Sequence, residues 1–238
     1  MAISKRVKGA LDGASWVRRM FEEGEELKQI YGEENIFDFS LGNPNLEPPP
    51  SLKKALKALA NHPITGMHRY MPNSGYSETR KAIAEYLTEE SGLPFNEKNI
   101  VMTVGAAGGL NVVLKAILDE ADEVIVPSPY FMEFKFYIEN CGGQIRLVET
   151  NKDFSLNMDQ IEKAICEKTK AILINFPNNP TGVVYDQQSL ENLGDLLKRK
   201  NRALEKILYL ITDEAYRRIV YDHIQLPIIF HCYPHTFR

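Results

Sequence analysis

The strongest constraint on the fold is a series of short apolar runs that begins near residue 99 and continues to residue 212. The runs are continuous in apolar residues, which is typical of strands buried on both faces of a sheet. Segments with helical spacing separate them, such as the stripe of Leu110, Leu114 and Ile117. This alternation predicts an α/β fold with three layers (αβα) and a mostly parallel sheet. The expected strands are 99–104, 123–127, 144–149, 171–175 and 207–212.

The same periodicity predicts helices elsewhere in the chain. Apolar spacing indicates helices over 14–31, from Leu52 to Leu59 and over 76–90, with a proline-punctuated extended segment at 37–50. Between the expected strands, we predict helices over 131–140 and around two further stripes. These stripes are Met158, Ile161 and Ile165, and Leu190, Leu193 and Leu197.

Ligands of open α/β sheets bind beyond the carboxyl ends of the strands, so the segments that follow the strands are the places to search. Four of them are unusual: "GAAGG" (105–109), "PSPY" (127–130), "NFPNNPTG" (175–182) and "DEAY" (213–216). They are distant in sequence, but a parallel sheet would bring them to one edge.

Each segment has a functional reading and a plainer one. "GAAGG" opens a helix and can bind a phosphate through backbone N–H groups, or it is only a tight turn. Tyr130 can stack on a flat ligand or simply pack, and Asn179 can donate to a ligand or form an Asx turn. Asp213 ends an apolar strand and needs a partner, which could be a ligand, a helix N-terminus, or Arg217 or Arg218.

As a set, the four segments match a ligand with a phosphate, a flat ring, a polar ring oxygen and a cationic ring nitrogen. Pyridoxal 5'-phosphate has all four, and a carboxylate against its pyridine nitrogen keeps that nitrogen protonated. The opening "GAAGGL" is not the GxGxxG pattern of dinucleotide-binding proteins.

Several stretches resemble the class I aminotransferases, which have the type I fold of pyridoxal-phosphate enzymes. The pair "NNPTG" and "DEAYRRIVYD" is similar to that family in both residues and spacing. "LGNPNLEPP", "HRYMPNSGYSETRKAIAEYL" and "PSPYF" also resemble it, so the resemblance covers nearly the whole chain. It implies transfer of an amino group between an amino acid and a 2-oxo acid, in a homodimer with shared sites.

The resemblance also implies roles for single residues. The backbone amides of Ala106 and Ala107 would hold the cofactor phosphate, and Tyr70 would reach the phosphate in the neighbouring subunit. Gly42 would lie beside the substrate carboxylate.

Four further residues would contact the ring of the cofactor. Tyr130 would stack on it, Asn179 and Tyr216 would bind its oxygen, and Asp213 would pair with its nitrogen.

The family's catalytic residue is a lysine in a Ser-x-Ser-Lys-like turn shortly after the DEAY motif. No such turn follows Asp213 in this sequence, so we expect no catalytic lysine here. We expect Lys198, Lys200 and Lys206 to be solvent-exposed surface residues. We therefore expect a truncated portion that is inactive alone. It would lack the C-terminal strands of a seven-stranded sheet and the C-terminal part of the small domain. Residues 1–50 would form the N-terminal arm and part of the small domain, and 51–238 an incomplete cofactor-binding large domain.

Composition and residue spacing also bear on nucleic-acid binding, cellular compartment, membrane insertion and metal binding. The net charge of −4 over 238 residues gives no reason to expect a nucleic-acid partner. The three cysteines are odd in number and have no CxxC spacing, which favours a reducing cytoplasm. No apolar run approaches the roughly 18 residues of a membrane span. Pro234 breaks the spacing of His231, Cys232 and His235, so we expect no metal site.

Two alternative functions stay open at this point. The same fold and cofactor serve carbon–sulfur lyases and enzymes similar to aminocyclopropane-carboxylate synthase. A relative without the lysine could also be a non-enzymatic protein. The sequence does not predict the preferred amino donor.

Overall fold

The computed structural model describes residues 3–4, 7–9, 15–37, 39, 42 and 46–238, and it divides into compact units at residues 1–69 and 70–238. The first unit contains α2 (Ser15–Tyr31), the 3-10 helix η1 (Glu33–Asn35) and α3 (Pro50–Asn61). The helices expected over 14–31 and from Leu52 to Leu59 are therefore confirmed. The boundary between the two compact units falls after Arg69, whereas the predicted domain boundary follows residue 50. The predicted domain assignment stays a prediction.

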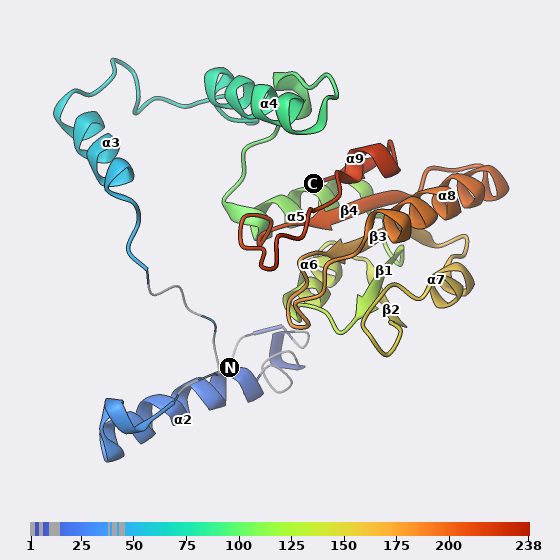
Figure 1. Ribbon diagram of the computed structural model, residues 1–238, viewed down its shortest axis with the longest axis horizontal. Coiled ribbons are helices and arrows are strands. Elements are labelled where there is room, and N and C mark those ends of the chain that lie inside the picture. The colour runs from blue at the N-terminus through green and yellow to red at the C-terminus, as the bar shows by residue number, and fades with distance from the viewer. Residues whose placement is uncertain (1–2, 5–6, 10–14, 38, 40–41, 43–45) are drawn as a thin grey trace. The chain divides into compact units, whose positions relative to one another are not determined.

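The second unit is built on a five-stranded, all-parallel sheet in the order β2-β1-β3-β4-β5. This confirms the predicted fold class. Figure 1 labels β1 to β4 of this sheet. Its strands are β1 (Glu123–Ser128), β2 (Gln144–Glu149), β3 (Thr169–Asn175), β4 (Tyr209–Asp213) and β5 (Thr236–Phe237). Its helices are α4 (Ser77–Ser91), η2 (Glu97–Asn99), α5 (Gly105–Ile117), α6 (Glu133–Asn140), α7 (Met158–Ala164), α8 (Gln187–Leu204) and α9 (Ile229–Cys232).

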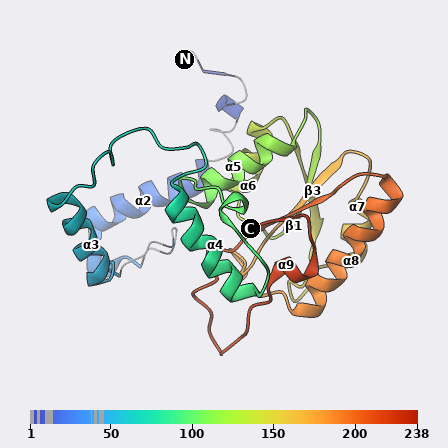
Figure 2. The ribbon, with the colours of Figure 1, turned by 90° about the horizontal axis from the view of Figure 1, so that it is seen from above.

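The sheet is sandwiched between two helical layers because its strands are apolar on both faces. In β3, Ile172 and Ile174 belong to a core with α7 and α8, whereas Ala171 and Leu173 belong to a core with α5 and α6. This division follows the two-residue period of a strand. Figure 2 shows α5 and α6 on one side of the strands and α7 and α8 on the other. Among the described residues, no helix is both long and apolar enough to cross a membrane.

The expectation of a strand at 99–104 is wrong. Residues 97–99 form η2, and 100–104 run on without strand pairing. The amide of Met102 donates to Ser74 O at 3.0 Å, and Val104 is 94% exposed. An apolar segment becomes a strand only when a neighbour exchanges backbone hydrogen bonds with it, and no described strand lies beside this one. The short elements α9 and β5 were not expected, because four and two residues carry no clear periodicity.

The packing of α8 on α9 gives a test of the fold. Gly194 is buried, and a Cβ atom placed on it would lie 2.2 Å from the backbone oxygen of Cys232. We expect Gly194→Ala to lower the free energy of unfolding by about 1–3 kcal/mol, because backbone cannot move aside cheaply. The matched control is Gly108→Ala in α5, where the nearest atom lies at 3.6 Å. That change should be neutral or stabilising by up to about 1 kcal/mol. Urea denaturation measures both, and equal effects would contradict the packing.

Candidate functional site

The carboxyl ends of β1, β3 and β4 lie at one edge of the sheet, because these strands are parallel neighbours. Asn175 and Asp213 stand opposite each other at the ends of β3 and β4. We call Tyr130, Asn179, Asp213 and Tyr216 the strand-end cluster. They belong to this edge because each ends one of these strands or follows it within four residues. The structure thus brings three of the four unusual segments to the same edge, as the sequence predicted.

Asn175 connects two of these segments, and the sequence reasoning assigned it no role. Its side chain is almost fully buried; Nδ2 donates to Asp213 O at 2.8 Å and Oδ1 accepts from Asn179 N at 2.7 Å. The amide of Phe176 also donates to Asp213 O, at 3.2 Å. A buried amide needs such partners, so a polar residue ending an apolar strand was the available signal. These bonds fix the start of the 175–182 loop to the end of β4.

The loop presents Asn179 to Tyr216. Nδ2 of Asn179 lies 3.2 Å from the hydroxyl oxygen of Tyr216 and donates to it. The plainer Asx-turn reading belongs to the preceding residue, because Asn178 Oδ1 accepts from Thr181 N at 3.1 Å and from Thr181 Oγ1 at 2.8 Å. The Asn179 side chain is therefore free of that turn. An amide and a phenol from two loops meet here, and both can donate to one acceptor oxygen.

Asp213 is the group in this cluster that most needs a ligand. Burial raises the pKa of its carboxyl, and a hydrogen bond from the Ala215 backbone opposes this in part. Its Oδ1 is buried and has no hydrogen-bond partner within the described residues. The alternative of an ion pair is wrong, because Arg217 binds Glu90 and Glu214 and Arg218 binds Tyr86. A buried carboxylate oxygen of this kind fits a cationic N–H donor.

The first turn of α5 offers backbone donors. Gly105 opens the helix with φ +68°, and the first intrahelical bond runs from Gly108 N to Val104 O at 3.3 Å. The N–H groups of Ala106 and Ala107 precede that bond, and both residues are exposed. The positive end of the helix dipole favours an anion there. Their role as phosphate ligands stays a prediction.

Tyr130 packs against the core shared by α5 and α6 while remaining partly exposed. Burial, and then the charge of Glu139, raise the pKa of its phenol. Tyr137 on α6 was not singled out from the sequence. Burial raises the pKa of its phenol most, followed by the charges of Glu133 and Asp213. Both stacking and plain packing of Tyr130 are consistent with this position, and its cofactor contact stays a prediction.

Tyr70 and Gly42 are the two remaining residues to which the resemblance gives a role. Tyr70 is fully exposed, and Gly42 belongs to the unit of residues 1–69. The contact of Tyr70 with a second subunit and the substrate contact of Gly42 stay predictions.

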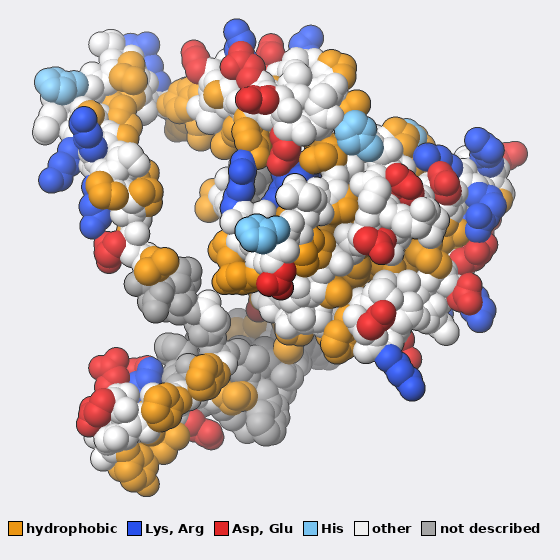
Figure 3. Space-filling model, in the orientation of Figure 1, with side chains coloured by type: hydrophobic (Ala, Val, Ile, Leu, Met, Phe, Trp, Pro, Cys, Tyr) orange, Lys and Arg blue, Asp and Glu red, His pale blue; other side chains and the backbone are white. Residues whose placement is uncertain are grey.

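The lysines of α8 and its C-terminal end are occupied elsewhere. Lys198 pairs with Asp195 at 3.0 Å, Lys200 with Glu162 at 3.3 Å, and Lys206 donates to the Glu167 backbone. Figure 3 shows acidic and basic side chains interspersed over α8. Within the part of the chain that the structure describes, the polar contacts of the strand-end cluster include no lysine.

The arrangement suits a particular ligand chemistry. The strand-end cluster has two side-chain donors for an oxygen and a buried carboxylate for a cationic nitrogen, and the first turn of α5 has N–H donors for an anion. Whether the site fits pyridoxal phosphate can be judged from Asp213, whose Oδ1 has no partner among the described residues. The protonated ring nitrogen of this cofactor would supply the missing hydrogen-bond donor. The described residues therefore fit this cofactor.

Comparison with known proteins identifies the relatives of this chain. The family model "Aminotransferase class I and II" matches residues 34–232. The aspartate/prephenate aminotransferase of Thermus thermophilus is 37% identical over 191 residues, covering 79% of this chain and 47% of the relative. A probable aspartate/prephenate aminotransferase of Aquifex aeolicus is 35% identical over 190 residues, covering 79% of this chain and 46% of the relative.

Solved structures agree with these relatives. An aminotransferase of Eubacterium rectale superposes with a TM-score of 0.93 at 35% identity, covering 99% of this chain and 60% of the other. Thermus thermophilus aspartate aminotransferase with maleate gives 0.80 at 32% identity, covering 99% and 59%. The chain spans about half the length of these curated relatives, at 46% and 47%.

Proposed function

Because the chain belongs to the class I and II aminotransferase family, we propose that the whole protein transfers an amino group between an amino acid and a 2-oxo acid, using pyridoxal phosphate. The observation that carries the proposal is the buried Asp213 carboxylate, whose Oδ1 has no partner among the described residues. The neighbouring Asn179–Tyr216 pair, which joins the loops after β3 and β4, supports it.

Some residues of the site would bind the cofactor, and Asp213 would keep its ring nitrogen protonated. When bound, pyridoxal phosphate supplies an electron-accepting ring to the reaction. Asp213 would hold a proton on the ring nitrogen, since its buried carboxylate would be stabilised by a cation. Asn179 and Tyr216 would bind the ring oxygen, Tyr130 would stack on the ring, and the amides of Ala106 and Ala107 would bind the phosphate.

We also propose that the protein acts as a cytoplasmic homodimer. The fully exposed Tyr70 supports a role for this side chain in the site of a second subunit, and Gly42 would contact the substrate carboxylate. All three cysteines are free, which is compatible with a reducing compartment. Several relatives are named aspartate aminotransferases, so aspartate is the first amino donor to test.

Cofactor binding by the strand-end cluster gives a direct test. A calorimetric titration of pyridoxal phosphate into the protein of residues 1–238 should show one saturable binding site. We expect Asn179→Ala to weaken binding by about three- to tenfold, the usual worth of one hydrogen bond. Asn192→Ala is the matched control, because Asn192 lies on the exposed side of α8, where its Oδ1 accepts a hydrogen bond from Gln188 Nε2. Absence of saturable binding, or equal effects of both variants, would contradict the proposed site.

A further inference from the structure

Four charged residues form a compact network beside the end of β4. Arg217 Nε contacts Glu90 Oε1 at 3.0 Å, and Arg217 Nη1 contacts Glu214 Oε2 at 3.1 Å. Arg238 makes a second bridge, with Nη1 at 2.6 Å from Glu90 Oε2 and Nε at 3.0 Å from Glu214 Oε2. We call Glu90, Glu214, Arg217 and Arg238 the arginine–glutamate network. It joins α4 to the segment that follows Asp213, across 127 positions of sequence.

The network is largely withdrawn from water. The Glu214 side chain is 4% exposed and that of Arg217 is 10% exposed. Burial raises the pKa of Glu214, although the charges of Arg238 and Arg217 oppose this. Burial would also raise the pKa of Glu90, but hydrogen bonds from Arg238 and Arg217 outweigh it and lower that pKa to about 2. Buried charges of this kind are costly unless every partner is present, which makes the geometry of the network specific.

Arg217 joins three separate parts of the chain. Its guanidinium binds a carboxylate on α4, a carboxylate next to Asp213, and the backbone oxygen of Pro227 at 3.2 Å. Its backbone amide donates to Glu214 O at 3.0 Å, and Ile219 N donates to Tyr216 O at 2.8 Å. The residues directly beside Asp213 and Tyr216 are therefore held by the network and by this turn, which spans residues 214–219.

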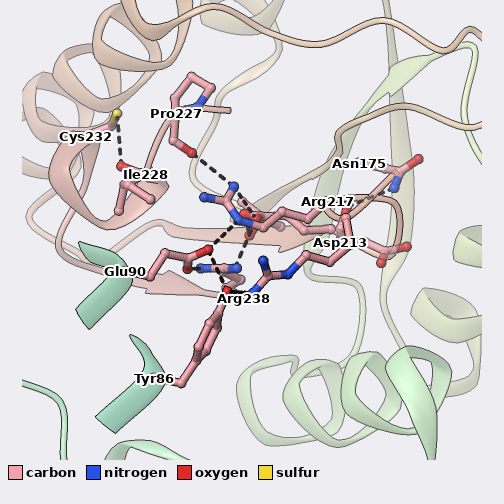
Figure 4. Close-up of polar contacts among 12 residues, drawn as sticks. Tyr86, Glu90, Asn175, Asp213, Arg217, Pro227, Ile228, Cys232 and Arg238 are labelled. Atoms are coloured by element: carbon pink, nitrogen blue, oxygen red, sulfur yellow. Dashed lines mark hydrogen bonds and ion pairs between the residues drawn. The ribbon is translucent and has the colours of Figure 1, made fainter. Parts of the chain in front are cut away.

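The Asp213 carboxylate itself faces elsewhere. Figure 4 shows Glu90, Arg217 and Arg238 gathered on one side of Asp213, with the carboxylate of Asp213 pointing away from them. Neighbouring side chains at the end of a strand point to opposite faces, so fixing Glu214 on one face directs Asp213 to the other. The network thus constrains the direction of a carboxylate that it does not touch.

We propose that Arg217 is a positioning residue for cofactor binding. By joining Glu90 on α4 to Glu214, it holds the 214–219 turn and thereby keeps Asp213 and Tyr216 in their places in the strand-end cluster. This inference rests on the proposed function, because it assumes that Asp213 receives the cofactor's ring nitrogen. Groups that orient a ligand-binding side chain are commonly worth about tenfold or more in affinity at metal sites, and we expect a similar effect here.

A double-mutant cycle on residues 1–238 tests this role. The wild type, Arg217→Gln, Asp213→Asn and the double variant are titrated with pyridoxal phosphate. We expect Arg217→Gln to raise the dissociation constant about tenfold in the wild-type background but less than about twofold in the Asp213→Asn background. A residue that only stabilises the fold would cost the same factor in both, and that result would overturn the proposal.

The matched control is Arg218→Gln, one residue further on. Arg218 lies outside the network and contacts Tyr86, with its guanidinium 5.0 Å from the ring centre. We expect its loss to change the dissociation constant by less than about twofold. If Arg217→Gln does not fold, as judged by circular dichroism, Arg217→Lys replaces it in the cycle, because it keeps the charge and loses the forked contacts.

Hydrogen exchange separates this inference from the proposed function. In cofactor-free protein, Arg217→Gln should speed exchange of the amides of 214–219 about tenfold relative to Arg218→Gln, while amides of β1 and β3 stay unchanged. Faster exchange with unaltered cofactor binding would overturn the positioning role alone. Failure of the wild type to bind pyridoxal phosphate would overturn the proposed function and the inference with it.

Discussion

Asp213→Asn is expected to weaken cofactor binding and at the same time to stabilise the cofactor-free protein. Its carboxylate is buried at the end of β4, with Oδ1 unpartnered among the described residues. Removing the charge lowers the cost of burial, which should raise the free energy of unfolding by about 1 kcal/mol. The neutral amide cannot hold the ring nitrogen protonated, so amino transfer by an active enzyme should fall about 10²- to 10³-fold. Gains in stability at the expense of function are typical of such sites.

The pH dependence of this stabilisation has a defined sign. Burial raises the pKa of Asp213 in the folded protein above its ordinary value of 3.8. The folded protein therefore binds this proton more tightly than the unfolded chain does. The cost of the charge is absent below pH 3.8 and grows as the pH rises through the raised pKa. The stability difference between Asp213→Asn and wild type should be small at acidic pH and reach a plateau towards neutral pH.

Urea denaturation across this pH range measures the effect, and Asp195→Asn is the matched control. Asp195 is 72% exposed and forms a surface ion pair with Lys198. Its replacement should change stability by less than about 0.5 kcal/mol at every pH. A destabilised Asp213→Asn variant at neutral pH, or one with undiminished cofactor affinity, would remove Asp213 from its proposed role.

The second large effect concerns residues 1–238 assayed alone. The lysines at and after the C-terminal half of α8 bind acidic groups or backbone, and the polar contacts of the strand-end cluster include no lysine in the described residues. A lysine is the group that would bond covalently to the cofactor and move the proton. We therefore expect no detectable amino transfer from this polypeptide, and we expect borohydride to fix no cofactor to a lysine at the strand-end cluster.

The comparison is a chimera in which the C-terminal half of the Thermus thermophilus relative follows residue 238. Both proteins are assayed for glutamate formation from 2-oxoglutarate with a panel of amino donors that begins with aspartate. We expect activity in the chimera alone, and its loss when Asp213→Asn is introduced. Cofactor-dependent turnover by residues 1–238 that survives repurification would show that one of its own lysines serves.

Much of this protein could be predicted from local sequence. The continuous apolar runs at 123–127 and 171–175 become β1 and β3, since a strand covered on both faces needs no polar side. The motifs with Asn179 and Asp213 directly follow buried strands, and the rule for parallel sheets then places them at one edge. These features depend on neighbouring residues and on the fold class, so they can be predicted from the sequence alone.

Other features were decided by tertiary structure alone. The run at 99–104 has the composition of a strand but not the backbone partners, and pairing is a property of the neighbour. Asn175 gained its role from two loops that meet around its amide. Arg217 was available in sequence as a partner for Asp213, yet it binds Glu90, far away in the chain. A charged side chain pairs with whichever group the fold brings within reach, and that distance is set by packing rather than by sequence spacing.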